Sequence, residues 1–123
     1  MKALYWFSLP INDLGDVHVF LSCPKLTPIL QGCLGITYLN TEGMVEVCIN
    51  AAYPRLTQDR TVAHEFFHCT MWGKKSLRLH HKKEECIADA FTTGWRFLKI
   101  PRRPRGAKAL EEYARKQEKN AKN

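Results

Sequence analysis

Two histidines four residues apart, with a glutamate after the first, are the feature that most constrains this chain. The motif reads His64-Glu65-Phe66-Phe67-His68. It lies in a segment free of proline and glycine, from about residue 58 to 72, which is apolar on nearly every side. Thr57 is a candidate N-cap for this segment, and Gly73 is a stop signal. The pattern predicts a buried helix.

The spacing of the motif places its two imidazoles together. Each helical residue advances about 100°, so His64 and His68 lie about 40° apart, one turn along the same face. Two such imidazoles can bind one metal ion, and Glu65 flanks them where a general base would lie. The alternative is two histidines that share a face by chance, with Glu65 solvated. An apolar helix disfavours this alternative, because uncompensated buried polar groups are costly.

A catalytic zinc site needs a third protein ligand. A second helix is predicted over about 82–98, and one of its faces is small and polar. Glu85 lies on this face and is the favoured ligand, while Asp89, one turn further, is placed to accept a hydrogen bond from a ligand imidazole. Four other candidates stay open: Glu84, Cys86, His80 and His81. Of these, Cys86 would make the site a structural one.

Two histidines and one glutamate suit hydrolytic chemistry. These ligands leave a zinc ion with net positive charge, which lowers the pKa of a bound water to about 7. Glu65 would take a proton from the attacking water and return it to the leaving amine, so the sequence predicts hydrolysis of a peptide bond. Tyr38 and Tyr53 are candidate hydrogen-bond donors to the oxyanion.

The remaining segments indicate an α+β fold. Residues 3–7 and 17–22 look like strands, and 36–39 and 44–49 flank turn residues as a β-hairpin does. We expect a small, mostly antiparallel sheet packed on the motif helix and the glutamate-bearing helix. The strand 44–49 is our candidate for an edge that pairs with an extended protein substrate.

The order of these motifs resembles the ImmA/IrrE-like zinc metallopeptidases of bacteria and their mobile elements. The likeness covers about residues 34–98. Asp59-Arg60-Thr61-Val62-Ala63-His64-Glu65 is similar to the start of the family's "RFTLAHELGH", and Glu85-x-x-Ala88-Asp89-x-Phe91 resembles its E-x-x-A-[ND]-x-F. The resemblance implies a minimal, gluzincin-like domain in a bacterial or phage protein. It also implies zinc ligands at His64, His68 and Glu85, with Glu65 as the base.

The length and the cysteine content limit the number of domains and the cellular compartments that we expect. With 123 residues the chain should form one domain, and no apolar run is long enough for a membrane span. The five cysteines are odd in number and include no CxxC pair. The N-terminus is a poor signal peptide. We therefore expect reduced thiols and a cytoplasmic protein.

The net charge of +7 is unevenly distributed. Residues 1–98 hold ten basic and nine acidic residues, whereas residues 99–123 hold nine basic and three acidic ones. We therefore expect a nearly neutral metallopeptidase domain at 1–98 and a basic, flexible tail at 99–123. Such a tail can bind nucleic acid or an acidic protein. A second hypothesis follows, a non-catalytic regulatory protein of the same fold that acts through this tail.

Overall fold

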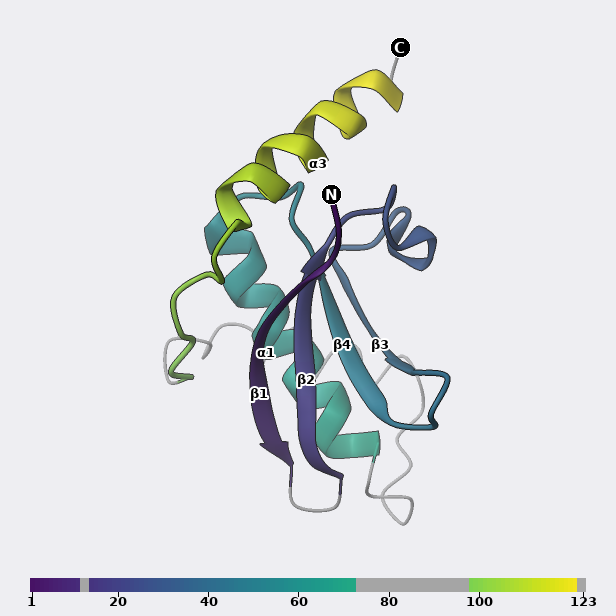
Figure 1. Ribbon diagram of the computed structural model, residues 1–123. Coiled ribbons are helices and arrows are strands. Elements are labelled where there is room, and N and C mark those ends of the chain that lie inside the picture. Colours follow the sequence, from purple (N-terminus) through teal and green to yellow (C-terminus); the bar gives the residue numbers. More distant parts are fainter. Residues whose placement is uncertain (12–13, 73–97, 122–123) are drawn as a thin grey trace.

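A four-stranded mixed sheet forms the centre of the structure (Figure 1). This computed structural model describes residues 1–11, 14–72 and 98–121. The strands are β1 (Leu4–Ile11), β2 (Gly15–Ser22), β3 (Gly35–Leu39) and β4 (Val45–Asn50), and they lie in the order β1-β2-β4-β3. β1 pairs with β2 and β3 with β4 in antiparallel fashion, while β2 and β4 are parallel. Among the described strands, β1 and β3 are therefore the edges.

One face of the sheet is covered by helix α1 (Arg55–Trp72), as Figure 1 shows. Side chains alternate between the two faces of a strand, so every second residue of the two central strands is buried in the core that α1 joins. These core residues are Val17, Val19, Leu21, Val45, Val47 and Ile49. From α1, Val62 and Cys69 complete the same core.

The predicted α+β class and the predicted hairpin are confirmed. The side-chain oxygen of Asn40 accepts hydrogen bonds from the backbone N–H groups of Glu42 and Met44. Gly43 has φ +78°, which residues with a side chain rarely adopt. Polar turn chemistry between two β-branched runs thus closes β3 against β4.

The predicted start of the motif helix was wrong. Thr57 is not an N-cap, because α1 begins at Arg55 and the Gln58 N–H already donates to the Pro54 carbonyl. Thr57 lies inside the helix, and its carbonyl accepts a hydrogen bond from the Thr61 hydroxyl. Proline restricts φ to a helical value, which suits the first turn of a helix. Pro54 was therefore a better signal for the start of α1 than Thr57.

A flexible tail was also expected, and the described residues contradict it. Helix α3 (Ala107–Ala121) begins beside the first turn of α1 in Figure 1. Ala107, Leu110 and Ala114 follow helical spacing and are buried in the common core. These three side chains, with Tyr113 packed against the same core, form the apolar side by which α3 is docked.

Polar contacts also fix the C-terminal segment to the domain. The Trp6 indole N–H donates to the backbone carbonyls of Pro101 and Arg102. The Arg55 guanidinium binds Glu111, with 2.7 Å from Nη2 to Oε1. These contacts join the first strand and the first turn of α1 to residues about fifty to one hundred positions later.

Three other expectations can be compared with the described residues. The four described cysteines are free thiols, and all but Cys33 are buried. No helix in the described ranges is long and apolar enough to cross a membrane. The predicted helix over 82–98 falls outside these ranges except for its last residue.

Candidate metal centre

His64 and His68 lie together on α1, one turn apart. Their Nε2 atoms are 3.1 Å from each other, and their ring centroids are 4.8 Å apart. Both side chains are half-buried. In this arrangement one imidazole can donate a hydrogen bond to the other, or both can direct a lone pair toward one shared cation.

The distance between the two nitrogens fits a zinc ion. Two ligands at about 2.0–2.1 Å in a tetrahedral site lie about 3.3–3.4 Å apart. The observed 3.1 Å is close to that tetrahedral edge. Two neutral imidazole nitrogens are also the commonest catalytic zinc donors in proteins. The pair can therefore supply two of the ligands without rearrangement of α1.

Glu65 points to the sheet and is only 5% exposed. The Thr37 hydroxyl, from β3, donates a hydrogen bond to Glu65 Oε2 at 2.5 Å. A buried carboxylate needs hydrogen-bond donors, and the Thr37 hydroxyl supplies one of them. The motif glutamate is thus held next to an edge strand of the described sheet.

Cys69 lies one turn after Glu65 and extends this buried contact. Its thiol forms a side-chain hydrogen bond with Thr37, and burial raises its pKa to about 12. The side chain is fully buried among the apolar residues of the core. Cys69 therefore belongs to the packing of α1 against β3 and not to the candidate ligands.

The close approach of α1 and β3 depends on a glycine. A Cβ at Gly35 would lie 2.6 Å from Thr61 Cγ2 and 3.1 Å from the Cys48 carbonyl oxygen. Four helical residues and two strand residues advance nearly the same distance, about 6.0 and 6.6 Å. Gly35 therefore meets Thr61, and two residues later Thr37 meets Glu65.

The predicted third ligand lies outside the described residues. The same holds for Asp89 and for the alternatives Glu84, Cys86, His80 and His81, so Glu85 remains the prediction. Within residues 1–11, 14–72 and 98–121, no group of three His, Cys, Asp or Glu side chains is placed to hold a metal ion. Of the predicted site residues, the described part brings the imidazoles of His64 and His68 together, while the Glu65 carboxylate contacts Thr37 of β3.

The structure does not support the two tyrosines as oxyanion donors. Tyr38 follows Thr37 in β3 and so points to the sheet face away from α1, where its hydroxyl donates to Glu46 at 3.0 Å. Burial and this carboxylate raise the pKa of Tyr38. Tyr53 precedes the first turn of α1, and Arg55 at that turn is about 14 Å along the axis from His64.

The strand proposed as the substrate-binding edge was also wrongly chosen. β4, which contains the predicted strand 44–49, pairs with β2 on one side and β3 on the other. Its buried valines and isoleucine make it a core strand, and its hydrogen-bonding groups are already used. The edge of the described sheet beside Glu65 is β3.

Thr37 was missed by the sequence analysis. A threonine in a predicted strand is ordinary, and only the pairing of β3 with α1 reveals its contact with the motif. One signal was available, because Thr37 and Gly35 lie on the same face of the predicted hairpin. Small residues at that spacing favour a closely packed helix.

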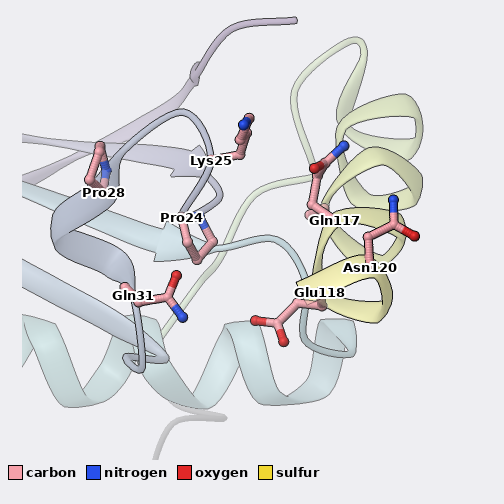
Figure 2. Close-up of a pocket in the computed structure, with 8 residues that line it drawn as sticks. Pro24, Lys25, Pro28, Gln31, Gln117, Glu118 and Asn120 are labelled. Atoms are coloured by element: carbon pink, nitrogen blue, oxygen red, sulfur yellow. The ribbon is translucent and has the colours of Figure 1, made fainter. Parts of the chain in front are cut away.

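An open groove of about 540 Å³ lies elsewhere, between residues 24–31 and the C-terminal half of α3. Figure 2 shows Gln117 and Glu118 on α3 facing a loop that carries Pro24 and Lys25. None of the motif residues lines it. The groove is therefore separate from the candidate metal centre.

Comparisons with known proteins add no assignment. No protein-family model, no curated protein and no solved structure matches this chain. The likeness to ImmA/IrrE-like peptidases therefore stays a prediction that rests on the motifs.

Proposed function

We propose that this protein is a zinc-dependent metallopeptidase that hydrolyses a peptide bond in a cytoplasmic protein. The observation that carries the proposal is the 3.1 Å separation of the His64 and His68 Nε2 atoms on α1. Glu65 follows His64 in the chain, and its carboxylate accepts a hydrogen bond from Thr37 of β3. The minimal zincin-like domain and its membership of the ImmA/IrrE-like group are part of the same proposal.

The proposed ligands are His64, His68 and, from the segment outside the described residues, Glu85. A zinc ion bound there would polarise the scissile carbonyl and make a water molecule more acidic. Glu65 receives the proton of the attacking water and delivers it to the leaving amine. The Thr37 hydroxyl donates to one carboxylate oxygen of Glu65 and so restricts the rotamers that this side chain can adopt.

The position of β3 suggests how substrate is bound. An edge strand offers unpaired backbone N–H and C=O groups to an extended peptide, and this pairing needs little from the substrate side chains. Because β3 carries Thr37, a peptide added to its outer edge passes close to Glu65. We therefore transfer the proposed substrate-binding role from β4 to β3.

A cleavage assay with one matched variant tests the proposal. Zinc-loaded wild type and Glu65→Gln are incubated with a peptide library made from a digested bacterial proteome, and mass spectrometry detects new N-termini. Loss of a general base lowers rates by about 10²–10⁴-fold, so only the wild type should produce new termini. Metal analysis should find equal zinc in both proteins.

Two results would refute the proposal. The first is equal cleavage by Glu65→Gln, which would exclude this glutamate as the base. The second is an absence of cleavage by a wild type that holds zinc, which would leave the metal a structural role.

A further inference from the structure

We propose that an exposed basic face on α3 and the segment before it binds the phosphate backbone of duplex DNA. The name basic face refers here to the exposed lysines and arginines of residues 99–119, which are Lys99, Arg102, Arg105, Lys108, Arg115, Lys116 and Lys119. The inference is independent of the proposed peptidase activity, because none of these residues belongs to the metal centre.

Two charged residues of the same segment are turned away from this face. Arg103 pairs with Asp59 at 2.8 Å, and Glu111 pairs with Arg55. Hydrogen bonds from Arg55 and Gln58 outweigh the effect of burial and hold the pKa of Glu111 below its ordinary value. Of the two acids that remain, Glu112 is exposed and Glu118 is half-buried. The outer surface of the segment is therefore strongly positive.

Because α3 is a helix docked on the core, some of its basic side chains form a row along one side of it. Lys108, Arg115 and Lys119 fall within about 40° of one another around the helix and span about 16 Å along it. The exposed Glu112 lies on the same side of the helix, so the row holds three positive charges and one negative charge. Leu110 and Ala114 anchor the opposite side of α3 in the core. A docked helix presents its charges without the loss of chain entropy that a flexible tail would suffer on binding.

The high charge density of nucleic acids favours them over an acidic protein as the partner of the basic face. Duplex DNA carries one negative charge per about 1.7 Å of its axis, and neutralising its phosphates releases bound counterions. The row on α3 carries net positive charge, and residues 99–119 add four more exposed cations that can contact phosphates. Such contacts position a protein on DNA without reading its sequence.

The absence of exposed aromatic groups from this face favours a duplex over a single strand. Proteins that bind single strands combine positive charge with aromatic side chains on which bases stack. Within residues 98–121 the only aromatic residue is Tyr113, and it packs against the core. The face therefore offers contacts to phosphates and none to unstacked bases.

The test is fluorescence anisotropy with a labelled 20-base-pair duplex, titrated with the full-length protein at several salt concentrations. The triple variant K108Q/R115Q/K119Q should bind at least about tenfold more weakly at 100 mM NaCl, with a salt slope smaller by up to about 2.7. Glutamine is a good helix former, and circular dichroism verifies that α3 persists.

Two controls distinguish an effect of these particular residues from an effect of the net charge of the protein. Arg115→Gln should weaken binding, whereas Arg60→Gln, which removes the same exposed group from α1, should change it less than twofold. The charge-conserving variant K108R/R115K/K119R should bind like the wild type.

Three results would overturn the inference. One is a wild type that fails to bind the duplex at 50 mM NaCl, and another is equal weakening by Arg60→Gln and Arg115→Gln. The third is tighter binding of polyglutamate or of single-stranded DNA than of the duplex, which would assign the face to an acidic protein or to single strands.

Discussion

The Thr37 hydroxyl donates a hydrogen bond to Glu65 Oε2 across the contact between β3 and α1, at 2.5 Å. The two residues are 28 positions apart, and each belongs to a different layer of the fold. This contact links the sheet directly to the motif. It explains how a carboxylate that is 5% exposed can be accommodated in the described structure.

Thr37→Val removes this hydroxyl while it keeps the shape of the side chain. A hydrogen bond to a charged group contributes about 1.5–3 kcal/mol, so we expect a loss of that size in the free energy of unfolding. Urea denaturation measures it. Thr37→Ser keeps the hydroxyl and should lose less, so equal losses in the two variants would show that Glu65 does not depend on this donor.

Gly35→Ala tests the close approach of β3 and α1. The new Cβ would lie 2.6 Å from Thr61 Cγ2, and overpacking of this kind costs about 1–3 kcal/mol. Thr61→Ser removes that methyl group and keeps the hydroxyl that donates to the Thr57 carbonyl. In thermal unfolding the double variant G35A/T61S should therefore recover part of the stability lost in G35A. No recovery would show that Thr61 does not set the spacing.

Glu111→Gln tests the docking of α3. The pKa of Glu111 is lowered in the folded state, so its ionised form stabilises the fold above the ordinary value of 4.5. This stability is lost as the pH falls through the lowered pKa. Arg55 is half-exposed, so we expect a cost of only about 1–2 kcal/mol at pH 7.

Chemical denaturation at pH 7 and at pH 3 checks this dependence. The difference between wild type and Glu111→Gln should be smaller at pH 3 than at pH 7. A difference that does not change between these two pH values would mean that the ion pair with Arg55 contributes nothing to docking.

Local patterns predicted the local structure of the chain. The turn at Asn40 and Gly43 closes the predicted hairpin, and the apolar segment around His64 forms a helix. The spacing of His64 and His68 was sufficient to predict that their imidazoles meet, because a single helix fixes that geometry.

Relationships between distant segments could not be predicted in the same way. The strand order decides that β3, and not β4, is an edge, and it depends on a parallel pairing of β2 with β4. The docking of α3 depends on Leu110 meeting a core built from other elements. A mostly polar helix with a few apolar residues looks the same in sequence whether it is docked or free.

The most direct test of the metal centre is a calorimetric zinc titration of the full-length protein. Wild type should bind one zinc ion per chain, and His64→Asn or His68→Asn should weaken binding more than about 100-fold, because even residues that only support a ligand contribute 10–100-fold. His18→Asn, which alters an exposed histidine of β2, should bind like the wild type. A wild type without zinc affinity, or equal losses at His18 and His64, would contradict a metal centre on α1.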